Sequence, residues 1–491
     1  MAEHRLSKSR FQTGLQCSKA LWLAVHEPQR ADPVSASQQR IFDRGTSLGD
    51  LARRLFPNGV LVAETHLQRA KALDTTARLL TGNAPALFEA AFEHGGVLVR
   101  ADLLVRVGAA EWDLYEVKSA TSVKDQYLTD VAIQTWVLEG CGQKVRRACV
   151  VHIDSSYVWP GGAYDLTKLF AVKEVTDTVR VLLPTLTSQV SAFQTMLAGP
   201  QPVVPIGRRC DTPYPCSFKG TCHRHVPSPS VFDLSRLKEA TLDRLIASGV
   251  LALRDVPLDT PGLLPAHREV LELVRSGQPR IVGDIAGALA GLPGPFHFLD
   301  FETVGPGLPL FPGTRPYQAI PFQWSNHVRH ADGRLEHREF LHEDRTDPRE
   351  AFLTSLLATT ADAGTVVVYS SYEQTQLTVL AAHFPDHAPA IDALKGKLFD
   401  LEKVVRAHLR HPSCLGRTSI KVVLPALVPD LSYERLAIGD GQQAAALYEQ
   451  FLTGQLDLLG QASLFDDLRT YCGTDTMAMV RLWDVLREGA F

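Results

Sequence analysis

Apolar and polar positions along the chain follow two periods, one typical of helices and one typical of strands. The helical period covers much of residues 1–56, a stretch over about 124–139, and a longer stretch that ends near 197. Strand-like runs lie between them: VLVRADLLVRV (97–107), WDLYEVKSA (112–120) and CVVHIDSSYVW (149–159). Because strands and helices alternate, the pattern predicts an α/β fold.

The second half of the chain continues this alternation after a change of character. Residues 199–230 are rich in Pro, Cys and basic residues, and residues 231–290 have a helical pattern. A short buried strand follows in PGPFHFLDFETVG (293–305), then a strand in TVVVY (365–369) and a final helix near 466–488. We therefore expect two α/β domains joined by a helical linker, with bounds 1–228, 229–292 and 293–491.

Composition and charge narrow the class of protein. A chain of 491 residues is long enough for two to four domains. A formal net charge of -4 gives no overall basic field, so a nucleic-acid partner would need local patches and bound cations. The N-terminal residues lack the apolar core of a signal peptide, and no apolar run approaches the ~20 residues that span a bilayer. We expect a cytoplasmic protein without a membrane partner.

The first group of candidate catalytic residues is Asp102, Glu116 and Lys118. Asp102 lies in one strand-like run, and Glu116 and Lys118 point to one face of the next because strand side chains alternate. Carboxylates that hold Mg²⁺ or Mn²⁺, with a lysine beside the attacking water, form a hydrolytic set for phosphodiesters. The alternative is a surface strand with an ion pair, but the surrounding residues are largely apolar, which favours a cleft.

Gln134 lies on the helix that follows these strands. Tyr127, Val131, Gln134 and Leu138 share one helical stripe, so Gln134 is polar on an otherwise apolar face. It is either a hydrogen-bonded core glutamine or a contact to the substrate or to the backbone of the active site.

The second group of candidate catalytic residues lies in the last third of the chain. FHFLDFET places Asp300 and Glu302 on one face at the end of a strand, and Tyr471 and Asp475 are four residues apart on a helix. Glu373 follows the strand TVVVY. Several convergent carboxylates form a two-metal site, and a tyrosine can orient the attacking water. For each acid by itself the alternative is a surface carboxylate.

Eight cysteines in a chain of this length do not suggest a disulfide scaffold. Cys210, Cys216 and Cys222 are spaced C-x5-C-x5-C, and Cys17 is remote from them. This spacing differs from the two close pairs of a zinc ribbon. The alternatives are a metal cluster, zinc or buried free cysteines, and the last is expected for the other four: Cys141, Cys149, Cys414 and Cys472.

The first group resembles the PD-(D/E)xK nucleases, especially the RecB-like branch. Arg100-Ala101-Asp102 stands at the Pro-Asp position, Glu116-Val117-Lys118 at the ExK motif and Gln134 at the helical Gln. The resemblance implies a restriction-endonuclease-like domain that holds metal through Asp102 and Glu116. Leu138 replaces the usual Tyr of the family. The glycines of residues 45–49 stand where many members have a metal-binding His. The site would then bind a single metal ion, or Asp50 or Glu89 would supply the substitute ligand.

The cysteine arrangement resembles the iron–sulfur subset of the RecB-like nucleases. There, one N-terminal and three C-terminal cysteines ligate a [4Fe–4S] cluster, although the C-terminal spacing is usually tighter. The resemblance implies that Cys17, Cys210, Cys216 and Cys222 are cluster ligands, with zinc as the second choice.

The second group resembles the DEDDy branch of the DnaQ-like 3′→5′ exonucleases, which have an RNase H-like fold. Asp300 and Glu302 match the D-x-E motif, and Tyr471 through Asp475 match Y-x3-D. Glu373 stands for the family's middle Asp, and Asp400 resembles an Asp that begins a structural turn. The resemblance implies that Asp300, Glu302, Glu373 and Asp475 bind Mg²⁺ or Mn²⁺ and that Tyr471 is catalytic.

Together the two resemblances imply a nuclease that processes DNA, with single strands or DNA ends as substrate, in repair, recombination or phage defence. The resemblances do not decide whether a helicase or a defence protein is its partner. The alternatives are an RNA 3′→5′ exonuclease, and an exonuclease whose first domain only holds DNA.

Overall fold

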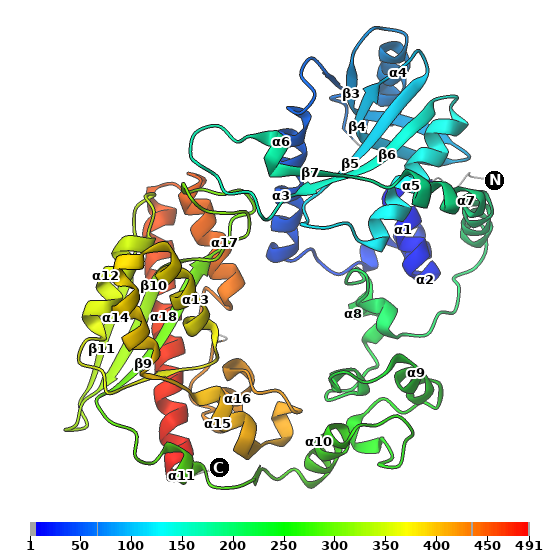
Figure 1. Cartoon of the computed structure of the whole chain (residues 1–491). Helices are drawn as coiled ribbons and strands as arrows, with labels where there is room; N and C mark the ends of the chain where they lie inside the picture. Colours follow the sequence, from blue (N-terminus) through cyan, green and yellow to red (C-terminus); the bar gives the residue numbers. More distant parts are fainter. Residues whose placement is uncertain (1–5, 66, 434–435, 490–491) are drawn as a thin grey trace. The chain divides into compact units, whose positions relative to one another are not determined.

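The computed structural model describes residues 6–65, 67–433 and 436–489, with only the backbone of Ala36 and Ser37. The structure is mixed α/β, as the pattern predicts (Figure 1). The chain divides into two compact units. Unit 1 ends at Val226 and also includes Pro312–Pro316, and unit 2 holds the remaining residues. Residues 229–292, which we expected as a linker, are part of unit 2.

Unit 1 is built on one sheet. Its strands are β1 (Leu6–Ser7), β2 (Val60–Leu61), β3 (Ala86–His94), β4 (Val97–Arg106), β5 (Glu111–Lys118), β6 (Lys144–Ile153) and β7 (Phe170–Glu174). Its helices are α1 (Lys8–Gln16), α2 (Ser18–His26), α3 (Ala36–Arg53), α4 (Arg69–Leu80), α5 (Asp125–Gly140), α6 (Leu166–Leu169), α7 (Thr176–Leu197) and α8 (Lys219–His223), with 3-10 turns η1 (Pro28–Arg30) and η2 (Arg208–Cys210).

The strand order in unit 1 is β2-β3-β4-β5-β6-β7, with β1 paired to β4. Strands β3, β4 and β5 are antiparallel neighbours, whereas β5 and β6 are parallel and joined through α5. Parallel neighbours need such a crossover connection. The strand that we expected to continue to Trp159 ends at Ile153, because the Asp154 carboxylate accepts the Ser156 N–H at 2.8 Å and turns the chain.

Unit 2 begins with a helical part. It contains η3 (Val231–Asp233), α9 (Glu239–Ala247), η4 (Leu253–Asp255), α10 (Pro265–Ser276) and α11 (Ile285–Leu289). The short strand β8 (Arg280–Ile281) pairs antiparallel with β14 (Leu409–Arg410). Leu415 also packs into the apolar cluster of this helical part. These contacts explain why residues 229–292 belong to unit 2.

The rest of unit 2 surrounds a second sheet. Its strands are β9 (Phe296–Val304), β10 (Ile320–Arg329), β11 (Leu335–Leu341), β12 (Thr365–Val368) and β13 (Leu398–Asp400). Its helices are α12 (Arg349–Thr359), α13 (Tyr372–His383), α14 (Ala388–Lys395), α15 (Leu401–His408), α16 (Ile420–Leu427), α17 (Gly441–Leu452) and α18 (Leu458–Glu488), with 3-10 turns η5 (Pro385–His387) and η6 (Pro412–Cys414).

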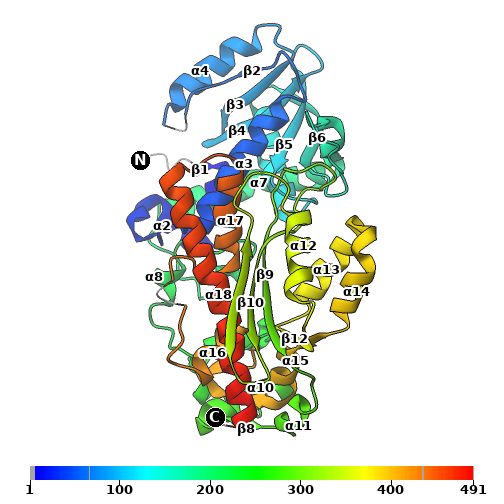
Figure 2. The ribbon, with the colours of Figure 1, turned by 90° about the vertical axis from the view of Figure 1, so that its left-hand side faces the viewer.

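The strand order in this sheet is β11-β10-β9-β12-β13. Strands β9, β10 and β11 are antiparallel, whereas β12 runs parallel to β9 and β13 runs parallel to β12. Helices α17 and α18 lie on one face of β9 and β10, and α12, α13 and α14 lie on the other (Figure 2).

The two faces of β9 have different partners because side chains alternate along a strand. Phe298 packs in the cluster with Trp483 of α18, whereas Leu299 and Phe301 pack against α12 and its neighbours. Asp300 and Glu302 share the face of Phe298 and are thus directed to α18. Helix α18 begins earlier than predicted, because the Asp457 side chain caps it by accepting the Gly460 N–H at 2.8 Å.

Among the described residues, none of the helices combines the length and the apolar composition that crossing a lipid bilayer requires.

Candidate functional site

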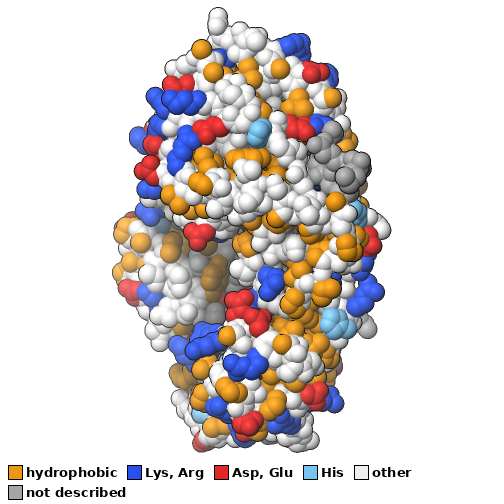
Figure 3. All heavy atoms as spheres, turned by 90° about the vertical axis from the view of Figure 1, so that its right-hand side faces the viewer, with side chains coloured by type: hydrophobic (Ala, Val, Ile, Leu, Met, Phe, Trp, Pro, Cys, Tyr) orange, Lys and Arg blue, Asp and Glu red, His pale blue; other side chains and the backbone are white. Residues whose placement is uncertain are grey.

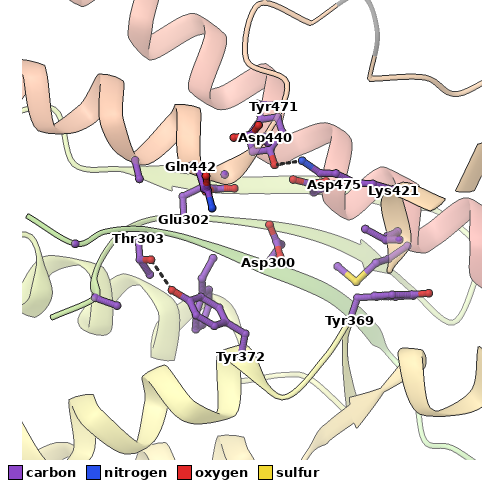
Figure 4. Close-up of a pocket in the computed structure, with 17 residues that line it drawn as sticks. Asp300, Glu302, Thr303, Tyr369, Tyr372, Lys421, Asp440, Gln442, Tyr471 and Asp475 are labelled. Carbon is purple, nitrogen blue, oxygen red and sulfur yellow. Dashed lines mark hydrogen bonds between the residues drawn. The ribbon is translucent and has the colours of Figure 1, made fainter. Parts of the chain in front are cut away.

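The acidic residues predicted in the last third of the chain line one cavity in unit 2. The cavity has a volume of about 780 Å³, and its walls include Asp300, Glu302, Tyr471 and Asp475 (Figure 4). Asp300 and Glu302 come from β9, and the other two come from α18, which crosses the same face of the sheet. Residues more than 160 positions apart in the sequence, such as Asp300 and Asp475, therefore face one another.

The closest group of possible metal ligands is centred on β9. Ligand atoms of Asp300, Glu302 and Cys472 all lie within 4.8 Å of one another. The Cys472 Sγ atom lies 4.0 Å from Asp300 Oδ2, and the thiol is fully buried. We expected Cys472 to be a buried free cysteine, and it is, but it also borders the acidic group.

Burial raises the pKa values of these carboxyls, and neighbouring negative charges add to the effect at Asp300 and Glu302. Burial raises the pKa of Asp300 well above its usual range, and the neighbouring Asp475 and Glu302 carboxyls add to the effect. The pKa of Glu302 is also raised well above its usual range by burial and by Asp475. Burial raises the pKa of Asp475 as well, although its hydrogen bond from Tyr433 opposes the change. Such a group of carboxyls favours bound protons or a bound cation.

Tyr471 belongs to a hydrogen-bonded set that the sequence did not reveal. Its hydroxyl accepts a hydrogen bond from Lys421 Nζ at 2.8 Å, and the Tyr433 hydroxyl donates to Asp475 Oδ1 at 2.6 Å. Lys421 is the one basic side chain among the described residues that line the cavity. It is also the single charge in the apolar run IKVVLPAL, which is a signal that could have marked it.

Glu373 does not line the cavity. It lies in the first turn of α13 with a side chain that is 2% exposed. Burial raises its pKa to about 7, and the nearby Asp400 carboxylate adds to the effect. Among the described residues, nothing hydrogen bonds to Glu373 Oε2 or Asp400 Oδ1, although both atoms are buried.

The turn before α13 is strained. Ser370 has a φ of 124°, a left-handed conformation that non-glycine residues rarely adopt. Its hydroxyl accepts the Tyr372 N–H at 3.1 Å and so holds the start of α13.

The negative charge of Glu373 also contributes to the raised pKa values of Asp300 and Glu302. The structure thus places Glu373 within electrostatic range of the other acids, with Asp400 as a further acid that we had regarded as structural.

The acidic residues predicted in the first half of the chain line a second cavity, which lies within unit 1. Its volume is about 1200 Å³, and its walls include Asp102, Glu116 and Lys118. The β4–β5 ladder stops at the pair Leu103–Tyr115, and beyond it the Asp102 carboxylate accepts the Val117 N–H at 2.8 Å. The separation of the two strands therefore creates the site.

Glu116 accepts hydrogen bonds at both carboxylate oxygens. Lys118 Nζ lies 2.8 Å from its Oε1, and Gln134 Nε2 donates to its Oε2 at 2.7 Å. Burial opposes ionisation, but the Lys118 and Lys8 ammonium groups hold the pKa of Glu116 well below its usual range. Burial and the Glu116 charge raise the pKa of Asp102 to about 7. The surroundings therefore favour the ionised form of Glu116 and the protonated form of Asp102.

Helix α5 contributes three side chains to this site. Gln134 is fully buried and bonds both to Glu116 and to the Asp130 carbonyl at 3.0 Å, so it is at once a core residue and a site contact. The Asp130 carboxylate accepts a hydrogen bond from Lys118, and the Tyr127 ring lies 5.1 Å from the Lys118 ammonium. Asp130 was missed, although it precedes Gln134 by one helical turn.

Glu89 and Asp50, the two proposed substitutes for the missing His, differ in position. Glu89 lines the cavity and lies opposite Asp102 in the β3–β4 register, between the pairs Phe88–Leu103 and Ala90–Ala101. Its φ of 57° interrupts the ladder. Asp50 is 59% exposed, pairs with Arg53 and is absent from the cavity walls. The geometry favours Glu89.

Lys8 was also missed. Its Nζ atom lies 2.7 Å from Glu116 Oε1, and it lines the same cavity. Burial would lower the pKa of the Lys8 ammonium, but the Glu116 and Asp102 charges raise it above its usual value. Lys8 lies in a polar N-terminal stretch, where the sequence gives no local signal of a site.

The four selected cysteines meet in unit 1. Cys17, which follows α1, lines a small cavity with Cys210, Cys216 and Cys222. All four are free thiols, and Phe218 and Ala20 pack beside them. Burial raises the pKa of Cys216 to about 11 and also raises that of Cys210. Three basic side chains, Lys19, Arg209 and Lys219, border the same cavity.

A family model described as a domain of unknown function (DUF2779) matches residues 297–419, which include all of β9 except its first residue and the segment with Glu373. A comparison with curated proteins gives no match.

Proposed function

We propose that the chain is a metal-dependent nuclease with two sites, a DEDDy-type 3′→5′ exonuclease in unit 2 and a RecB-like PD-(D/E)xK nuclease in unit 1. The observation that carries the proposal is the meeting of Asp300, Glu302 and Asp475 across one cavity, where burial raises the pKa of all three carboxyls and the charge of Asp475 raises the pKa values of Asp300 and Glu302 further.

The arrangement of unit 2 supports an RNase H-like exonuclease domain. Along the chain, the three antiparallel strands β9, β10 and β11 come first, and β12 and β13 then run parallel to β9. Their order in the sheet is β11-β10-β9-β12-β13. The D-x-E pair is on the central strand, and the Y-x3-D pair is on the helix that crosses it. Glu373 fits the middle acid less closely, because it lies outside the cavity walls.

The donor set in unit 2 fits divalent cations. Several buried carboxyls with a single lysine leave an excess of negative charge, and oxygen ligands suit Mg²⁺ or Mn²⁺. Asp300, Glu302 and Asp475 would hold the metal, with Glu373 as the candidate fourth ligand, and the metal would neutralise charge on the phosphate and activate water. Lys421 Nζ donates a hydrogen bond to the Tyr471 hydroxyl at 2.8 Å and so holds this hydroxyl in the cavity of the acids, where it can orient water.

The arrangement of unit 1 supports the PD-(D/E)xK site. Asp102, Glu116, Lys118 and Gln134 meet through direct hydrogen bonds or across adjacent strands. Asp102 and Glu116, with Glu89 as a third carboxylate, are the residues that would hold a divalent cation. Lys118 is placed to act on water or on phosphate charge.

The four cysteines Cys17, Cys210, Cys216 and Cys222, which we call the cysteine cage, support an iron–sulfur cluster over zinc. Tetrahedral zinc bonds of about 2.3 Å would bring thiolates within about 4 Å of one another. Among the described residues, no three of these four Sγ atoms lie within 4.8 Å of one another. A larger cluster holds its ligands farther apart, and the adjacent basic residues suit its negative charge. Cys17, Cys210, Cys216 and Cys222 would then join the first helices of unit 1 to its last.

DNA is the proposed substrate, with RNA as the alternative. On the face drawn in Figure 3, basic and acidic side chains are interspersed with apolar ones. Because the formal net charge of the chain is -4, binding would rest on metal ions and on the basic residues in the two cavities more than on an overall basic field.

The test is cleavage of end-labelled single- and double-stranded DNA and RNA with Mg²⁺ or Mn²⁺ by the full chain and two variants. Asp300→Ala should remove exonuclease ladders that start at 3′ ends. Glu116→Ala should remove the other activity. Cleavage by the double variant at the wild-type rate would contradict both assignments, and loss of DNA binding without loss of cleavage in Glu116→Ala would make unit 1 a scaffold.

A further inference from the structure

Lys8 brings a second ammonium group to the acidic site of unit 1. Its Nζ atom and that of Lys118 both lie within hydrogen-bond distance of Glu116 Oε1, at 2.7 and 2.8 Å. The Lys8 side chain is 24% exposed and lines the cavity that also holds Asp102. Its charge therefore lies beside Glu116 and within electrostatic range of Asp102, in the cavity where a phosphate would bind.

The position of Lys8 is unfavourable for the helix that carries it. Lys8 is the first residue of α1, after the cap Ser7, and the first turn of α1 contains no acidic residue. A cation at a helix N-terminus is repelled by the helix dipole. The helix therefore gains no stability from a lysine at this position, whereas the ion pair with Glu116 accounts for its presence.

Helix α1 is fixed along its length, so Lys8 is held in place. Gln12 donates to Thr129 of α5 at 2.8 Å. Gln16 donates to the carbonyls of Arg209 and Tyr214, each at 2.7 Å. Cys17 then ends the helix in the cysteine cage. One short helix thus connects the cage to the Glu116 carboxylate.

We propose that Lys8 is a catalytic residue of unit 1 that contacts the phosphate and supplies the positive charge that a second metal ion would otherwise supply. The proposal rests on the proposed nuclease function of this unit. Water forms a new bond to phosphorus, the bond to the departing oxygen breaks, that oxygen takes up a proton, and the water proton passes to the solvent. Lys8 keeps its own proton and stabilises the charge on the phosphate.

The test uses the full chain with Asp300→Ala, so that only unit 1 can cleave. Lys8→Gln removes the charge, Lys8→Arg keeps it, and Lys173→Gln on the exposed part of β7 is the matched control. We expect Lys8→Gln to lower kcat on the order of 100-fold with little change in KM for DNA. Mn²⁺ binding, measured with the metal alone, should become several-fold tighter because a neighbouring positive charge is removed. Lys8→Arg should recover part of the rate.

Opposite changes in turnover and Mn²⁺ affinity distinguish catalysis from a structural role. A wild-type rate in Lys8→Gln, or a lower rate with weaker Mn²⁺ binding, would overturn the role of Lys8. If Glu116→Ala is inactive while Lys8→Gln is fully active, only this inference fails. If Glu116→Ala still cleaves like its Asp300→Ala parent, or if that parent does not cleave, the nuclease function of unit 1 fails and the inference fails with it.

Discussion

Replacement of Glu373 by glutamine should stabilise the metal-free protein at alkaline pH and lower the exonuclease activity that we propose for unit 2. Glu373 is 2% exposed, and its Oε2 atom has no hydrogen-bond partner among the described residues. Glutamine keeps the size and neutrality of the protonated acid but cannot become charged. The variant therefore separates the cost of a buried charge from the loss of a metal ligand.

The size of the effect follows from the pKa. Burial raises the pKa of Glu373 from 4.5 to about 7. At about 1.4 kcal/mol per pH unit, this change corresponds to roughly 3 kcal/mol. Because the folded protein binds this proton more tightly than the unfolded chain, the stabilisation is fully present below pH 4.5 and is lost as pH rises through about 7. Glutamine avoids that loss.

The assay is scanning calorimetry of the full chain in EDTA between pH 4.5 and 8.5, and then with Mn²⁺. At roughly 2–4 °C per kcal/mol, the Tm of unit 2 in Glu373→Gln should exceed that of the wild type by roughly 6–12 °C at pH 8.5. The difference should vanish near pH 4.5. Added Mn²⁺ should stabilise the wild type more than the variant.

Glu350→Gln is the matched control, since Glu350 is also in the first turn of a helix but is exposed. It should leave both Tm and activity unchanged. The reasoning is refuted if Glu373→Gln has the same pH dependence as the wild type or is less stable at pH 8.5. Full exonuclease activity in a more stable variant would retain the electrostatic argument but exclude Glu373 as the middle metal ligand.

Three further predictions follow from the contacts. Tyr471→Phe should slow exonuclease turnover by roughly 100-fold with Mn²⁺ binding unchanged, and Lys421→Met should add little when combined with it, because Lys421 acts through the Tyr471 hydroxyl; additive losses in kinetic assays would contradict this coupling. Cys216→Ser should lose iron and sulfide in anaerobic metal analysis and lower the Tm of unit 1, whereas Cys141→Ser should retain both; zinc without iron in the wild type would exclude the cluster. Gln134→Leu removes the donor to Glu116 Oε2 and should cost about 1–3 kcal/mol in denaturant unfolding and slow cleavage by unit 1, so an unchanged stability would argue against this hydrogen bond.

The sequence by itself determined the local parts of the two sites. The two-residue period of a strand directs Asp300 and Glu302 to one face, and likewise Glu116 and Lys118. The helical period does the same for Tyr471 and Asp475. The α/β class also follows from these periods, because apolar spacing reports which face of an element is buried.

Only the tertiary structure decided which parts meet. Lys8 reaches Glu116, and Lys421 reaches Tyr471, through the docking of α1 and α16. Cys17 joins the later cysteines in the same way. The sequence period fixes the direction of a side chain within its own element, but the order of strands in a sheet and the packing of helices on it fix the neighbours that are distant in the chain.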